Sequence, residues 1–266
     1  MDSRTSSLPS ASAAGSTRTT AATAASPVQQ YLPAILLAFL LSPAVAFANT
    51  STVFSPDVTA GERALEYRTS YVPEDGASPD VFAHRLHYQQ AFNDAWRARI
   101  IGVQRSVDGR SLEYRYTRLE VQWQYLEDQD AGWDAGLRFE AQVGDESPDR
   151  FRIAWTGKVD LDNGWQLRAN ALVGRQFGTG AASGLQLETR AQVTRKVRPG
   201  MSLGLELFSD LNTTAETGSF DEQEHQLGPV LKASAGNKWS LFAGYLAGIS
   251  DAADDSDWRF MVIREF

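Results

Sequence analysis

The sequence contains no cysteine, only three histidines and, beyond its amino-terminal region, no uninterrupted apolar run. The absence of cysteine excludes a disulfide framework and thiolate metal sites, and it suits an exported protein. The absence of further apolar runs excludes a helical membrane bundle, because each spanning helix needs about 20 mainly apolar residues. Basic residues are also few, with 25 Lys and Arg against 33 Asp and Glu, giving a formal net charge of -8. This balance argues against nucleic acid as a partner, since nucleic-acid binders carry clustered Lys and Arg.

The one apolar run has the organisation of a signal peptide. Residues 1–30 are rich in Ser, Thr and Ala without a period of 2 or 3.6, so we expect them to be unstructured. Residues 31–41 form an apolar core, Pro43 interrupts it, and an Ala-Phe-Ala sequence ending at Ala48 supplies small residues for cleavage. The sequence therefore predicts export and cleavage after Ala48, leaving residues 49–60 as a short lead. An uncleaved inner-membrane anchor is the alternative, because the run is just long enough to span.

The rest of the chain is dominated by segments in which apolar and polar residues alternate. In residues 133–143 every apolar side chain falls on one face, and the other face carries Asp134, Arg138, Glu140 and Gln142. Successive side chains of a strand point to opposite faces of a sheet. Such segments predict a sheet with lipid on one side and water on the other, as in a transmembrane β-barrel. A helix would need apolar residues three and four positions apart, a spacing that differs from the one seen.

Twelve segments fit this pattern, and an even number returns both ends of the chain to one side of the membrane. We therefore expect residues 61–266 to form an all-β, antiparallel transmembrane β-barrel of about 12 strands. Short links with Gly, Asn or Pro follow the even-numbered strands, whereas longer acidic links tend to follow the odd-numbered ones. Short periplasmic turns and longer outer loops are typical of these barrels. The expected strands are residues 62–72, 81–92, 95–105, 111–126, 132–143, 150–160, 164–176, 184–196, 200–210, 224–234, 238–249 and 257–266.

Tryptophan residues gather at one end of the expected barrel. Five of them stand directly beside even-numbered links, and hence near the periplasmic end: Trp96, Trp123, Trp133, Trp165 and Trp239. Amphipathic rings settle at the boundary between membrane and water, so we predict that these five form an aromatic girdle.

The last strand carries the most specific signal. Phe260, Val262 and Phe266 fall on one face, and Phe266 ends the sequence. A final strand of alternating apolar residues ending in Phe resembles the insertion signal of Gram-negative outer-membrane β-barrel proteins. The resemblance covers most of residues 60–266 and departs from the usual pattern at Arg264, whose charge can extend into the headgroup region. It implies outer-membrane lipid, lipopolysaccharide and the barrel-assembly machinery as partners.

We expect no catalytic residue, no metal site and no cofactor. His84 and His87 lie on opposite faces of one strand, which is poor geometry for shared ligation or catalysis. The sequence around His225 faintly resembles the His-x-Ser motif of outer-membrane lipid hydrolases, but Leu227 stands where the nucleophilic serine is required. An outer-membrane hydrolase is therefore kept only as an alternative. The acidic residues 251–257 are expected to form a hydrated loop that bridges to lipopolysaccharide phosphates through divalent ions.

The lumen is the most informative place for function, because charged side chains of both signs should point into it. Two arrangements are open: the charges pair into a network that fills a narrow barrel, or they line an aqueous path for a small polar solute. The residues predicted to line the lumen are Arg138, Glu140, Arg152, Lys158, Asp160, Arg168, Glu188, Arg190 and Glu206.

A narrow passive pore for small polar solutes is the function we expect. The first alternative is a non-conducting barrel that anchors an envelope system through its acidic loops. The second is a soluble periplasmic barrel that binds an apolar ligand with its apolar face turned inward. Charged residues would then cover the outside.

Overall fold

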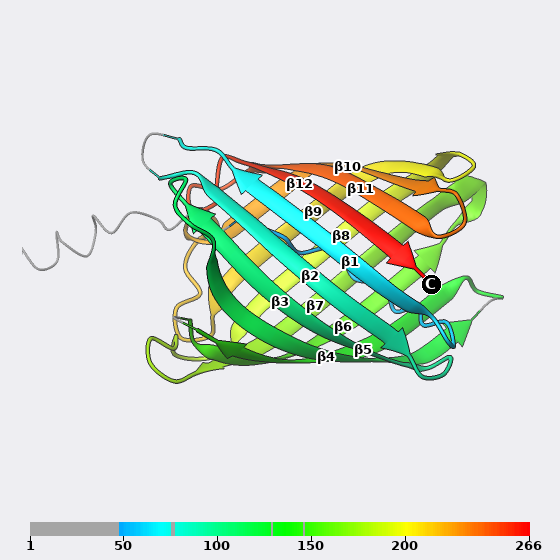
Figure 1. Ribbon diagram of the computed structural model, residues 1–266, viewed down its shortest axis with the longest axis horizontal. Coiled ribbons are helices and arrows are strands. Elements are labelled where there is room, and N and C mark those ends of the chain that lie inside the picture. Colours follow the sequence, from blue (N-terminus) through cyan, green and yellow to red (C-terminus); the bar gives the residue numbers. More distant parts are fainter. Residues whose placement is uncertain (1–47, 76–77, 129, 146) are drawn as a thin grey trace, which may run out of the picture. The chain divides into compact units, whose positions relative to one another are not determined.

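Twelve antiparallel strands form a closed barrel in the computed structural model of the chain (Figure 1). The structure describes residues 48–266 except 76–77, 129 and 146, so the predicted leader and its rival membrane anchor fall almost wholly outside the described residues. The predicted number of strands is confirmed, and each predicted boundary lies within three residues of the observed one. The strands are β1 Arg63–Val72, β2 Val81–Ala91, β3 Trp96–Val107, β4 Glu113–Asp128, β5 Trp133–Gly144, β6 Asp149–Asp160, β7 Trp165–Phe177, β8 Gln186–Arg198, β9 Met201–Thr213, β10 Glu224–Ala235, β11 Trp239–Gly248 and β12 Ser256–Glu265. Two short 3-10 turns, η1 Asp162–Gly164 and η2 Phe220–Glu222, lie in the links.

Every strand pairs with its neighbours in sequence, and β1 pairs with β12 to close the sheet. The closing register runs from Ala64 opposite Glu265 to Tyr71 opposite Trp258. The start of β1 and the end of β12 therefore lie at the same end of the barrel as the short even-numbered links. Following the loop asymmetry of such barrels, we call this the periplasmic end and the opposite one the outer end. In the part of the chain that the structure describes, no helix is long and apolar enough to cross a membrane.

The short links at the periplasmic end contain residues suited to tight turns. Between β6 and β7, Asn163 has φ 60° and Gly164 has φ 78°. Asn and Gly enter this left-handed region at lower cost than other residues. Between β2 and β3, the Asn93 side chain accepts hydrogen bonds from the backbone N–H groups of Ala95 (2.9 Å) and Trp96 (2.8 Å). These local preferences allow very short links to reverse the chain.

The barrel is apolar outside and charged inside. Leu119 and Phe151 are 56% and 44% exposed on the outer surface, whereas Arg138 and Glu206 are 1% and 0% exposed on the inner wall. In water, such an outer surface would leave a large apolar area solvated, and lipid removes that cost. The alternative of a soluble barrel, with an apolar interior and a charged outer surface, is therefore wrong.

Residues 49–58, the lumen segment, run through the inside of the barrel before β1 begins (Figure 1, blue). At the outer end, the backbone N–H of Asn49 donates to the carboxylate of Asp257 at the start of β12 (2.6 Å). Just after the segment, the N–H of Ala60 donates to Asp94 in the periplasmic turn between β2 and β3 (3.1 Å). The segment thus spans the lumen from its outer end to its periplasmic end. The sequence predicts only a short lead here and gives no sign of this path.

Candidate functional site

The structure places most of the predicted lumen residues on the inner wall. Five of them are buried, each 5% exposed or less: Arg138, Glu140, Arg152, Arg190 and Glu206. Three others face the interior with partial exposure: Lys158, Arg168 and Glu188. The ninth, Asp160, ends β6 at the periplasmic rim, where its side chain is 51% exposed and lies 3.3 Å from Lys158. That these residues line a transport path stays a prediction.

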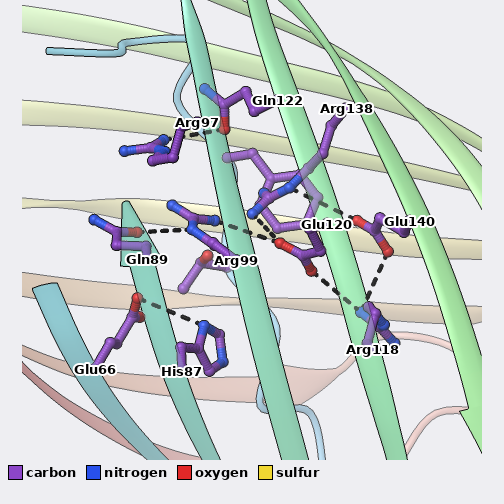
Figure 2. Close-up of polar contacts among 12 residues, drawn as sticks. Glu66, His87, Gln89, Arg97, Arg99, Arg118, Glu120, Gln122, Arg138 and Glu140 are labelled. Carbon is purple, nitrogen blue, oxygen red and sulfur yellow. Dashed lines mark hydrogen bonds and ion pairs between the residues drawn. The ribbon is translucent and has the colours of Figure 1, made fainter. Parts of the chain in front are cut away.

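A belt of arginine and glutamate side chains crosses the inner faces of β3 to β8, from Arg99, which lies 3.6 Å from Glu120, to Arg190. Figure 2 shows Glu120 of β4 and Glu140 of β5 near one another among guanidinium groups. Arg118 lies 3.7 Å from Glu120 and 3.3 Å from Glu140, and Arg138 lies 2.5 Å from Glu120. The belt therefore joins neighbouring strands through side chains as well as through the backbone ladder.

The belt continues through Arg152 and Glu188. Arg152 of β6 binds Glu140 (2.7 Å) and Glu188 of β8 (2.5 Å), although β7 lies between these two strands. Glu188 in turn binds Arg190 (2.7 Å). Each carboxylate of the belt is shared by at least two arginines, so its charge is fully compensated.

The strand register explains why the arginines are needed. Glu120 and Glu140 are directly opposite in the β4–β5 ladder, and like charges in that position destabilise a sheet. Both side chains are also buried, with exposures of 4% and 2%. Buried carboxylates are tolerated when they are paired and hydrogen-bonded. The arginines therefore stabilise an arrangement that the backbone register alone would disfavour.

Glu206 of β9 is the centre of a second buried cluster. Its carboxylate accepts hydrogen bonds from Arg259 of β12 and from the amide of Gln192 of β8. The Lys232 ammonium donates to the Gln192 carbonyl oxygen (2.5 Å), and Arg259 donates to the backbone carbonyl of Ser51 (3.0 Å). This second cluster holds the outer part of the lumen segment against the wall.

Phe54 anchors the lumen segment near the middle of the barrel. Its side chain is largely buried, and the guanidinium carbons of Arg138 and Arg190 lie 3.8 and 4.7 Å from the ring centroid. Guanidinium groups are attracted to the face of an aromatic ring. The Asn170 side chain accepts from the Phe54 N–H (2.7 Å) and donates to its carbonyl oxygen (3.1 Å). One wall side chain therefore satisfies both backbone groups of Phe54.

Asp57 anchors the segment near the periplasmic end. Its carboxylate lies 2.6 Å from the Lys158 ammonium and accepts a hydrogen bond from the Ser55 hydroxyl (2.6 Å). Burial acts to raise the pKa of Asp57, but the bonds from Lys158 and Ser55 outweigh burial and hold the pKa below its usual 3.8. The Gln122 amide donates to the Pro56 carbonyl oxygen (2.7 Å). The segment is thus held by charge, amide and aromatic contacts along its length.

Two cavities lie beside the lumen segment. The outer cavity has a volume of about 510 Å³ and includes residues 48–51 in its lining. The inner cavity has a volume of about 540 Å³ and includes residues 52–55 and 57. Each is within the range of small-molecule sites, roughly 300–1,000 Å³. The charges therefore pair into a network, and two cavities remain beside it. That a polar solute passes through this space stays a prediction.

The prediction from sequence omits several inward-facing residues, although the alternation marks them. In β4, Arg118, Glu120 and Gln122 are buried, and they alternate with exposed Leu119 and Val121. The same alternation that was applied to the later strands identifies them. The contacts of the lumen segment, in contrast, had no periodic signal.

The histidines of β2 point to opposite faces, as predicted. His87 is 1% exposed inside the barrel, and its ring lies 3.7 Å from Glu66 (Figure 2). His84 faces outward, where its ring nitrogen shares a hydrogen bond with the Tyr67 hydroxyl. The two rings therefore cannot act on one bound molecule.

Aromatic residues lie on the outer surface near the periplasmic end. The five tryptophans of the predicted girdle are between 37% and 45% exposed. Trp96 and Trp123 stack with their ring centroids 5.5 Å apart. Phe260 and Phe266 are 44% and 56% exposed. The girdle and the assembly signal, which also includes Val262, stay predictions.

Solved structures of outer-membrane barrels share this fold. The COG4313 outer membrane channel from Pseudomonas putida F1 matches with a TM-score of 0.60 at 10% sequence identity, over 83% of this chain and 100% of that chain. The KdgM porin in complex with disordered oligogalacturonate matches with a TM-score of 0.56 at 10% identity, over 76% of this chain and 99% of that chain. The resemblance to Gram-negative outer-membrane β-barrel proteins is therefore confirmed at the level of the fold.

The sequence comparisons identify a family. No curated protein matches the sequence. A family model matches residues 119–256, just over half of the chain, from β4 to the first residue of β12. This region contains Glu120, Glu140 and Glu188, the three carboxylates of the belt. The chain therefore belongs to the family described as "Putative MetA-pathway of phenol degradation".

Proposed function

We propose that this protein is a narrow passive channel for small polar solutes in the outer membrane of a Gram-negative bacterium, exported with a leader that is cut after Ala48. The observation that carries the proposal is the charged inner wall with two cavities beside the lumen segment. A barrel that served only as an anchor would be more stable with a fully packed interior, because buried charge is costly to desolvate. Charged, open space is what a polar solute requires.

The fold supports the same proposal. Of the two structural neighbours described above, one is a channel and the other a porin. The lumen segment makes the path narrower than the barrel wall alone would. We infer that solutes pass when this segment shifts or that only small solutes pass beside it.

Two solute classes merit testing first. The family description names phenol degradation, which suggests phenol-like aromatic compounds. The KdgM structure is a complex with oligogalacturonate, which suggests organic anions. The belt favours anions, because its five arginines outnumber its three glutamates. The arginines of the belt are Arg99, Arg118, Arg138, Arg152 and Arg190.

Conductance of the purified barrel in planar bilayers tests this function. We expect ohmic single-channel steps with a preference for anions. Arg138→Glu and Arg168→Glu place negative charge beside the inner cavity, so each should shift the reversal potential toward cation preference. Arg195→Glu is the matched control, because Arg195 of β8 faces outward over the Trp165 ring.

The contradicting result is a correctly folded barrel that stays silent at all voltages. It would favour the non-conducting envelope barrel instead. Equal reversal potentials for the inner-wall variants and Arg195→Glu would show that ions take no path along this wall.

A further inference from the structure

We propose that the outer cavity is a binding site for a small organic carboxylate, held by Arg85, Arg118 and Arg150. The proposal rests on the channel function above and deepens it, since it names a solute class and the place where that solute pauses. Seven arginines line this cavity of about 510 Å³, against only three carboxylates. Excess positive charge in a confined space focuses the field on an entering anion.

Two of these arginines, Arg85 and Arg150, are not neutralised by the protein. By contrast, Arg152 and Arg190 both bind Glu188, at 2.5 and 2.7 Å. Among the described residues, neither Arg85 nor Arg150 lies within salt-bridge distance of a carboxylate. The carboxylates of the neighbouring belt are already shared by other arginines. The cavity therefore carries uncompensated positive charge on its arginine-rich wall.

Neutral oxygens join the three guanidinium groups into a row. The Tyr116 hydroxyl accepts from Arg85 (3.0 Å) and from Arg118 (3.3 Å). The Gln142 carbonyl oxygen accepts from Arg118 (2.8 Å) and from Arg150 (3.3 Å). These oxygens satisfy individual donors, but they do not cancel charge. Two of the four bonds, at 3.3 Å, are longer than a usual N–H···O bond, so an anion would compete well for those donors.

Arg85 is buried and has no carboxylate partner among the described residues. It is 6% exposed, and its Nε has no hydrogen-bond partner in the described part of the chain. It also stands directly opposite Arg68 in the β1–β2 ladder, where like charges destabilise the sheet. Arg68 has its own partner in Glu66, 2.5 Å away. A bound anion would give Arg85 the compensation that the protein does not provide.

The shape of the donors and of the cavity favours a carboxylate on a small apolar group. A guanidinium presents parallel N–H groups that match the two oxygens of a carboxylate. Val103 and Phe208 also line the cavity and offer apolar surface to the rest of the molecule. Benzoate combines these two features and is therefore a suitable probe. Phenol is the matched probe without a carboxylate, and it is neutral at pH 7.

Isothermal titration calorimetry of the detergent-purified full barrel at low salt tests the site. We expect benzoate to bind and phenol to bind at least tenfold more weakly. Arg85→Gln and Arg150→Gln should each weaken benzoate binding about tenfold or more, since each removes a charge-assisted contact. Arg195→Gln, on the outer surface, is the control and should leave the affinity unchanged. Heat-modifiable migration on gels verifies that every variant is folded.

Three results would overturn the site: equal affinity for benzoate and phenol, equal benzoate affinity in Arg85→Gln, Arg150→Gln and the unaltered barrel, or binding of inorganic phosphate without binding of benzoate. Calorimetry does not depend on conduction. Loss of benzoate binding in a conducting barrel therefore overturns this inference alone, and benzoate binding in a silent barrel overturns the channel proposal alone.

Discussion

Truncation of Phe54 is expected to open the barrel. The Phe54 ring is 6% exposed, and two guanidinium groups lie over it at 3.8 and 4.7 Å. Replacing a buried Phe by Ala costs about 3–5 kcal/mol, and the cation contacts are included in that loss. We take about 3 kcal/mol, at the low end, because the surrounding cavities let water fill part of the space. That energy corresponds to a shift of more than about a hundredfold in the docking equilibrium of the lumen segment.

The assay is single-channel recording of Phe54→Ala beside the unaltered barrel. We expect larger or more frequent openings, because the barrel wall is unchanged while the segment releases more often. Phe151→Ala on the outer face of β6 removes a ring of the same size from a site 44% exposed, and should leave the conductance unchanged. Identical recordings from Phe54→Ala and the unaltered protein would refute the view that the docked segment limits the path.

Three further predictions concern the belt, the periplasmic anchor and the terminus. Glu140→Gln leaves Arg152 with one carboxylate fewer and should lower the free energy of unfolding in urea by about 3–5 kcal/mol. Asp57→Asn should lower it far less, because the Asp57 carboxylate is 43% exposed. Equal losses in the two variants would contradict a stabilising role for the belt. The folded-state pKa of Asp57 lies below its usual 3.8, so the pair with Lys158 stabilises docking of the lumen segment at pH values above 3.8. This stabilisation is lost as the pH falls through the lowered pKa of Asp57. Conductance should therefore rise only below about pH 4, and Asp57→Asn should abolish the rise. Deletion of Phe266 should reduce the heat-modifiable folded barrel in isolated outer membranes, and normal yield would remove this residue from the assembly signal.

Much of the fold could be predicted because lipid imposes a period of two on each strand. In β5, the alternation of Leu137, Phe139 and Ala141 with Arg138 and Glu140 already defines which face meets the membrane. Turn residues such as Asn and Gly then fix where the strands end. These signals are local, so a single sequence contains them.

The arrangement inside the barrel depends on contacts between distant residues. The sequence marks Asp160 as inward-facing, but alternation gives the face of a strand and not the depth, and the residue lies at the rim. The lumen segment has no strand ladder, and its backbone is satisfied by side chains such as Asn170 and Gln122. Those side chains come more than sixty positions later in the chain. No periodic pattern encodes such pairings.

The most direct test of the account is a nitroxide scan along β5 of the reconstituted barrel, which is straightforward because the chain has no native cysteine. Labels at Ala141 and Val143 should collide with oxygen dissolved in lipid, and a label at Gln142 should instead collide with a water-soluble nickel reagent. Equal access of the water-soluble reagent to all three positions would contradict a charged, wet lumen enclosed by a wall that faces lipid.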